Sequence, residues 1–167
     1  DLMNDGLQTT DELQNKIFAS AQRGRASYAA TASSIATLGT QARDAFGSND
    51  ELIAFMEQIN KTMVIAGSSA TGAESTMYNL TQALATGVLR GQDLNAVMSN
   101  AQPIVQNIAD YLDVPVGQIR DMAAQGQITA DIIKNAMFAA ADETNAKFES
   151  MPKTIGQIWT SIKNRAI

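Results

Sequence analysis

Apolar residues recur every three or four positions along most of the chain, with polar residues between them. This spacing is typical of an α-helix that buries one face. Four such stripes cover the first half: Leu13 with Ile17; Tyr28, Ile35, Leu38, Ala42 and Phe46; Leu52, Phe55, Met56, Ile59 and Met63; and Met77, Leu80 and Leu84. The first half of the chain is therefore predicted to be helical.

The helix prediction is weakest for residues 28–40, because this stretch consists mostly of Ser, Thr and Ala. A flexible linker is the competing interpretation of such a composition. The heptad-like apolar seam continues through the stretch, however, and favours a helix with Gly39 as a kink or a break.

Helix starts are indicated where Ser or Thr is followed three residues later by Glu or Gln. In such a capping box each side chain satisfies a free backbone N–H of the first turn. We assign helix starts to four instances of this pattern: Thr9 with Glu12, Ser48 with Glu51, Thr71 with Glu74, and Thr154 with Gln157.

The helical spacing continues through the second half, where Pro103 and Pro115 are each expected to open a helix in its first turn. Nothing alternates with a period of two for long enough to form a sheet. The stripes are Leu94, Val97 and Met98; Ile104, Val105, Ile108 and Leu112; Ile132, Ile133, Ala136, Met137, Ala140 and Phe148; and Ile155, Ile158, Trp159 and Ile162. We therefore predict an all-α fold, a compact irregular bundle of about seven to nine helices without a sheet.

The predicted core combines the central members of these stripes. It contains Phe55, Ile59, Leu80, Leu84, Leu94, Ile108, Leu112, Ile119, Ile132 and Ala136. A chain of 167 residues that is 45% apolar can bury one such core, so residues 1–167 are expected to form a single domain. The chain begins with Asp, and a helical pattern is still running at Ile167, which indicates a piece of a longer protein.

The amino-acid composition excludes several kinds of functional site and partner. The chain contains no Cys and no His, which excludes disulfides and removes the commonest metal ligand and general base. The net charge of −5 argues against nucleic acid as a partner. Residues 147–167 are the exception, with four bases against Glu149. No apolar run is long enough to suggest a membrane span.

Two patterns that suggest catalysis or phosphate binding are better explained by helix ends. GSSATGAE, at residues 67–74, has the glycine frame of a phosphate-binding loop, but Ala73 and Glu74 stand where Lys and Ser or Thr are needed. The acidic pairs at residues 11–12 and 50–51 lie in predicted first helical turns, where negative charge is favourable. We therefore predict no catalytic residue, no cofactor and no metal site.

One phrase occurs twice, as ATGVLRGQDL at residues 85–94 and as AQGQITADII at residues 124–133. Each copy has a glycine where a helix is predicted to stop, the position that favours a left-handed backbone. An aliphatic residue that packs back on the helix follows two positions later. We interpret both copies as tight helix–glycine–helix corners, built by Gly87, Leu89 and Gly91 and by Gly126, Ile128 and Thr129, with Thr129 as a helix cap.

The alternative is a helix-turn-helix DNA-binding regulator, since residues 111–136 have the spacing of two short helices around a glycine turn. Residues 110–131 contain four Asp against Arg120 alone. A recognition helix with this excess of negative charge would be repelled by the phosphates of DNA.

Several stretches closely resemble the N-terminal domain of bacteriophage and prophage tail tape measure proteins. They include LTQALATGVLRGQDLNAVMSNAQPIVQNIADYLDV, IRDMAAQGQITADIIKNAM and FESMPKTIGQIWTSIKN, and the resemblance runs from about Thr9 to the end. The most specific part is GVLRGQDLN followed by GQITAD; the family more often has Glu at Gln92 or Asp93.

The resemblance implies a structural role without catalytic residues. Tape measure proteins are long helical chains that occupy the tail tube, act as the scaffold on which it polymerises and set its length. The implied partners are tail-tube and tail-assembly proteins and other copies of the chain, with neither nucleic acid nor membrane bound by this domain. The implied location is the virion tail, with the host cytoplasm during assembly.

The last predicted helix, Thr154–Ile167, is a candidate interface because it is basic and holds the only tryptophan. Its candidate contact residues are Trp159, Lys163 and Arg165, since tryptophan is enriched at interface hot spots. The competing interpretation is that Trp159 closes the core of its own domain.

Overall fold

The computed structural model describes residues 10–23 and 28–152, and these are almost entirely helical. They form nine α-helices and one 3₁₀ turn, η1 (Arg43–Ala45). The helices are α1 (Thr10–Arg23), α2 (Tyr28–Gln41), α3 (Asn49–Ala66), α4 (Ala70–Thr86), α5 (Gly91–Asn100), α6 (Gln102–Leu112), α7 (Val116–Ala124), α8 (Ala130–Ala139) and α9 (Ala141–Glu149). The predicted all-α class, the absence of a sheet and the number of helices are confirmed for this part of the chain.

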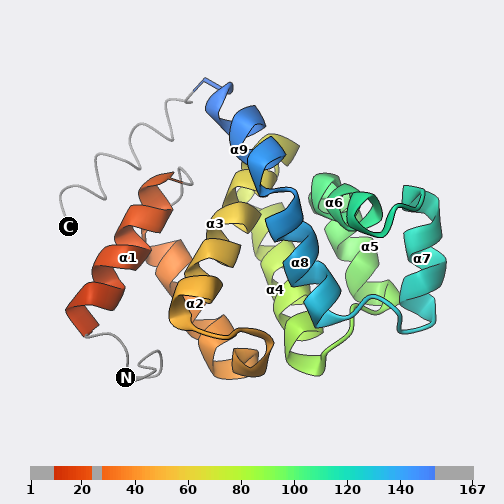
Figure 1. Cartoon of the computed structure of the whole chain (residues 1–167), viewed down its shortest axis with the longest axis horizontal. Coiled ribbons are helices and arrows are strands. Elements are labelled where there is room, and N and C mark those ends of the chain that lie inside the picture. Colours follow the sequence, from red (N-terminus) through yellow and green to blue (C-terminus); the bar gives the residue numbers. More distant parts are fainter. Residues whose placement is uncertain (1–9, 24–27, 153–167) are drawn as a thin grey trace.

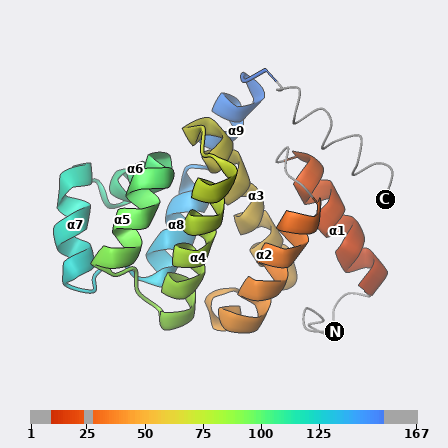
Figure 2. The same cartoon turned by 180° about the vertical axis from the view of Figure 1, so that it is seen from behind.

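The helices surround α3, which packs against α1, α2, α6, α8 and α9. In Figure 1, α9 lies in front of the upper end of α3 and α8 lies in front of α4, and the view from behind in Figure 2 brings α2 and α4 to the front. Helices α5, α6 and α7 form one end of the bundle, and α1 lies at the other end. The centre of the core is therefore the long helix that the third apolar stripe predicted.

The predicted core is confirmed with two qualifications. Phe55, Ile59, Leu80 and the other predicted core residues are buried, except for Leu112 and Ile132. Those two side chains are partly buried and pack against the same cluster. Leu112 is the last residue of α6, and Ile132 stands on the flank of the buried face formed by Ile133, Ala136 and Met137.

Helix starts follow the predicted capping chemistry in one case and depart from it in another. Ser48 caps α3 by accepting the N–H of Glu51 (3.1 Å), as predicted. Thr71 was predicted to cap the next helix, which is wrong, because Ser69 does so by accepting the N–H of Gly72 (3.0 Å). The Ser68 hydroxyl donates to the carbonyl oxygen of Asn100 (2.6 Å), which fixes the short connection so that α4 already begins at Ala70. Thr9 and Thr154 lie outside the described residues.

Three further predictions concern helix boundaries. Residues 28–41 are a helix rather than a linker, and the helix continues past Gly39 without a break. Pro103 stands in the first turn of α6, as predicted, whereas Pro115 is the residue before α7 and serves as its N-cap. The long stripe from Ile132 to Phe148 belongs to two helices, which meet at Ala140.

Candidate functional site: the paired glycine corners

The first copy of the repeated phrase forms the corner between α4 and α5. Helix α4 ends at Gly87, whose left-handed backbone (φ +94°) lets its N–H donate to the carbonyl oxygen of Ala83 (2.9 Å). Leu89, two residues later, is fully buried in the core. Gly91 is the first residue of α5, and a Cβ placed there would contact nothing within 4 Å.

The second copy forms the corner between α7 and α8. Gly126 has a left-handed backbone (φ +71°), and the N–H of Gln127 donates back to the carbonyl oxygen of Met122 (2.9 Å). This is the hydrogen-bond pattern of a Schellman helix end, which favours glycine at the left-handed position. Ile128 is fully buried, and the hydroxyl of Thr129 accepts the N–H of Ile132 (3.3 Å) to cap α8.

The two corners contact each other through their backbones. The N–H of Leu89 donates to the carbonyl oxygen of Ile128 (2.8 Å), and the N–H of Ala130 donates to that of Gly87 (2.9 Å). These bonds make an antiparallel bridge between Val88 and Thr129. The repeat is therefore used as a pair: each copy turns the chain sharply, and the extended residues after each glycine bond to those of the other.

The repeated sequence pattern predicts where each corner lies but not that the two corners pair. A signal was present, because both copies place a large aliphatic residue two positions after the glycine, with a polar residue or a helix start next. Two short extended segments that both bury a side chain leave backbone groups that need partners. The pairing satisfies them.

The one titratable group with a shifted pKa at the corners is Asp93, in the first turn of α5. Burial raises the pKa of this carboxyl, and the nearby charge of Arg90 acts in the opposite direction. Among the described residues no group of three or more acidic side chains is placed to hold a metal ion. The corners therefore have a structural role: their backbone hydrogen bonds fix the α4–α5 connection against the α7–α8 connection.

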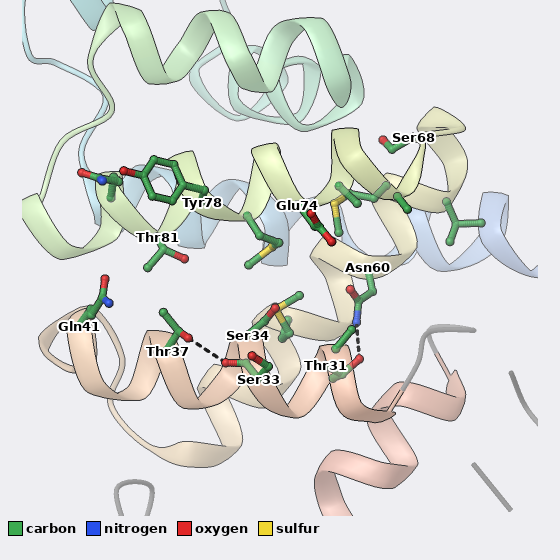
Figure 3. A pocket seen from close by; sticks show the side chains of 18 residues that line it. Thr31, Ser33, Ser34, Thr37, Gln41, Asn60, Ser68, Glu74, Tyr78 and Thr81 are labelled. Carbon is green, nitrogen blue, oxygen red and sulfur yellow. Dashed lines mark hydrogen bonds between the residues drawn. The ribbon is translucent and has the colours of Figure 1, made fainter. Parts of the chain in front are cut away.

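A second feature is a groove of about 640 Å³ between α2 and α4, with α3 as its floor. Figure 3 shows Ser33, Ser34 and Thr37 on the α2 wall and Glu74, Tyr78 and Thr81 on the α4 wall. Three methionines, Met56, Met63 and Met77, also line it. Tyr78 is 65% exposed. No sequence pattern predicted this groove.

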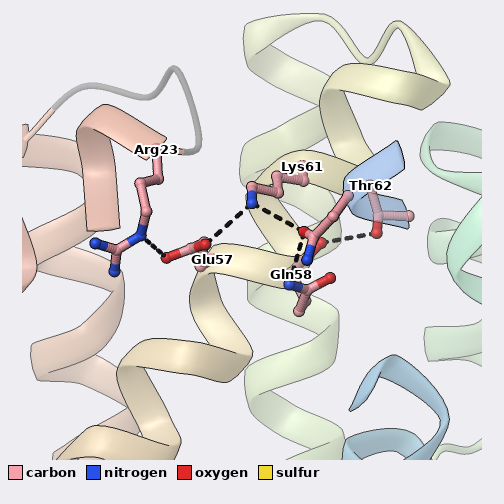
Figure 4. Close-up of polar contacts among 6 residues, drawn as sticks. Arg23, Glu57, Gln58, Lys61 and Thr62 are labelled. Atoms are coloured by element: carbon pink, nitrogen blue, oxygen red, sulfur yellow. Dashed lines mark hydrogen bonds and ion pairs between the residues drawn. The ribbon is translucent and has the colours of Figure 1, made fainter. Parts of the chain in front are cut away.

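Helix α9 is fastened to a different side of α3 by a polar network (Figure 4). The ammonium of Lys61 donates to the carboxylate of Glu57 (3.0 Å) and to the side-chain oxygen of Asn145 on α9 (2.9 Å). The side chain of Arg23 on α1 reaches the same carboxylate (2.7 Å). Lys61 also lies over the ring of Phe148, 5.5 Å from its centre. These contacts tie α1, α3 and α9 together.

The candidate interface residues Trp159, Lys163 and Arg165 lie outside the described residues. Within the described residues, every helix is too short or too polar to cross a membrane.

A sequence model of the tape measure protein family matches residues 1–167. No curated protein and no solved structure matches the chain.

Proposed function

The chain belongs to the tape measure protein family, a family of structural proteins of phage tails, and on this premise we propose that it acts as tape measure and scaffold during tail assembly. The observation that carries the proposal is the family match over the whole of residues 1–167. In this role the protein sets the length of the tail while tail-tube subunits polymerise around it.

Residues 1–167 are, in this proposal, one helical domain of a longer tape measure protein. Supporting this is the shared core, to which helices from α1 to α8 contribute. The paired corners add support of a different kind, because their backbone hydrogen bonds join two helix connections that lie about 40 residues apart in the sequence. The partners are tail-tube and tail-assembly proteins and other copies of the chain, first in the host cytoplasm and then in the virion tail.

The alternative function, a helix-turn-helix DNA-binding regulator of phage origin, gains no support from the fold. The second helix of the proposed helix-turn-helix, α8, buries Ile133, Ala136 and Met137 against the rest of the bundle. The turn before α8 forms the backbone bridge to the other corner, between Thr129 and Val88.

Tail length tests the proposal directly. In the phage or prophage that encodes this chain, in-frame deletions of helical sequence outside residues 1–167 should shorten the tails seen by electron microscopy. The expected shortening is about 1.5 Å for each residue deleted, the rise of an α-helix. Tails of unchanged length across a series of deletions would overturn the tape measure role.

A further inference from the structure

The groove between α2 and α4 has the chemistry of a site for an apolar helix face. Its α2 wall consists of small or uncharged residues, among them Ala30, Ser33 and Ser34, and Glu74 is the only charged residue that lines it. Methionine side chains are flexible and adapt to large apolar partners. The volume of about 640 Å³ lies within the range of about 300 to 1,000 Å³ that is usual for binding pockets.

The length of the groove suits a short helix. Its lining runs from residue 30 to residue 41 on α2 and from residue 70 to residue 82 on α4. At 1.5 Å per residue, the α2 wall is about 18 Å long. A helix of about 12 to 15 residues would therefore lie along it, in the manner of helix-in-groove recognition.

The sequence contains one segment with matching properties. In residues 153–167 the apolar residues Ile155, Ile158, Trp159 and Ile162 follow the spacing of one helix face. The same segment has three bases and no acid, whereas residues 1–152 hold 17 acids and nine bases, a net charge of −8. The segment is thus complementary in charge to the body that carries the groove, and Glu74 lies on the groove wall.

The geometry of α3 indicates which copy supplies the segment. At 3.6 residues per turn, the floor residues Met56, Asn60 and Met63 lie on one side of α3. Gln58 and Lys61, which bind Asn145 of α9, lie on the opposite side. Figures 1 and 2 agree, with α9 on one face of the bundle and α2 and α4 on the other. The described chain therefore ends on the face away from its own groove, which favours a second copy as the partner.

We propose that residues 153–167 of one copy dock in the α2–α4 groove of a second copy, with Ile158, Trp159 and Ile162 over the methionines. The contact joins two different surfaces, so it is head-to-tail, and it either closes into a ring or extends from copy to copy. The proposal goes beyond the tail function and is tested on the isolated chain, so that failure of either one leaves the other standing.

Cysteine cross-linking between copies tests the proposed docking. The chain has no native cysteine, so only the introduced cysteines can form disulfides. One variant carries Ser34→Cys in the groove, and a second carries Ile162→Cys in the segment. The two are mixed and oxidised, and the mixed disulfide between chains is quantified by mass spectrometry. The matched control replaces the first variant by Ser99→Cys, at an exposed serine of α5 outside the groove.

We expect the mixed disulfide with Ser34→Cys to exceed that with Ser99→Cys by about tenfold or more, the effect of about 1.4 kcal/mol of specific binding. Equal yields with the two serines would overturn the proposal. So would a chain carrying both Ser34→Cys and Ile162→Cys that forms only its internal disulfide when diluted with an excess of unmodified chain, because the segment would then occupy its own groove.

A second measurement uses Trp159, the only tryptophan of the chain. As the protein concentration rises, docking between copies should shift its emission to shorter wavelength, and Ser34→Arg should move that transition to about tenfold higher concentration. Ser99→Arg is the matched control and should leave the transition in place. Circular dichroism verifies that both variants are folded. Emission that is independent of concentration, or equal effects of the two substitutions, would contradict docking between copies.

Discussion

Replacement of Gly87 by Ala tests whether the first corner depends on a left-handed backbone. Gly87 has φ +94°, and a Cβ added there would meet nothing within 4 Å. Gly117 offers a matched control, because a Cβ added there also meets nothing within 4 Å, but the residue lies in α7 with an ordinary helical backbone. The two substitutions add the same methyl group to open space, on a left-handed backbone at Gly87 and on a helical backbone at Gly117.

The expected effects have opposite signs. A side chain on a left-handed residue costs about 1 to 2 kcal/mol, so Gly87→Ala should lower the free energy of unfolding by that amount. Ala in place of Gly in the middle of a helix gains about 0.5 to 1 kcal/mol, and Gly117 is the second residue of α7, so Gly117→Ala should raise the free energy of unfolding by up to that amount. For a chain of this size, 1 kcal/mol shifts Tm by about 2 to 4 °C, and the two variants should differ in Tm by about 2 to 12 °C.

Urea unfolding followed by helical circular dichroism measures both variants against the unmodified chain. The midpoints should move in opposite directions while the slope with urea stays unchanged, which indicates that stability alone has changed. If Gly87→Ala were as stable as the unmodified chain, or if both variants moved in the same direction, the argument from backbone conformation would be refuted.

Three further predictions concern the corners and the start of α3. Leu89→Ala should cost about 2 to 5 kcal/mol in urea unfolding, because Leu89 is fully buried; a loss below 1 kcal/mol would contradict its packing. Thr129→Ala should cost about 0.5 to 2 kcal/mol by removing the cap of α8, and Thr129→Ser should retain most of that stability. The N–H of Gly47 and then Lys134 hold the pKa of Glu51 below its ordinary value of 4.5, so the folded state favours the charged carboxylate. Glu51→Gln should therefore lower stability at pH 7, by about 1 kcal/mol or less because the side chain is partly exposed. The difference should vanish as the pH falls through the lowered pKa, and a difference unchanged near pH 3 would count against it.

The helices and the core could be predicted because they depend on local periodicity. The Ser48 cap could also be predicted, since donor and acceptor are three residues apart in sequence. The joint at Ala140 could not, because Ala140 keeps a helical backbone (φ −88°, ψ 0°) and the apolar stripe continues through it. Gly39 was misread as a kink or break because it is a helix breaker in isolation, whereas in α2 it lies buried against the bundle.

The candidate site was predictable only in part, for a related reason. The left-handed glycines, the buried Leu89 and Ile128 and the Thr129 cap are consequences of the local sequence. Their pairing joins residues about 40 positions apart and depends on how α5, α6 and α7 fold back. The groove likewise depends on the spacing of α2, α3 and α4, which no single helix pattern encodes.

The bridge between the corners also has a kinetic consequence. The bonds of Leu89 and Ala130 close a loop of about 40 residues. Loop closure costs about 0.6 kcal/mol for each doubling of length, so this closure costs about 2 kcal/mol more than that of a four-residue turn. The bridge is therefore expected to form late, after α5, α6 and α7 have assembled, and to be absent from the folding transition state. Substitutions that weaken it should act on the rate of unfolding and leave the rate of folding almost unchanged.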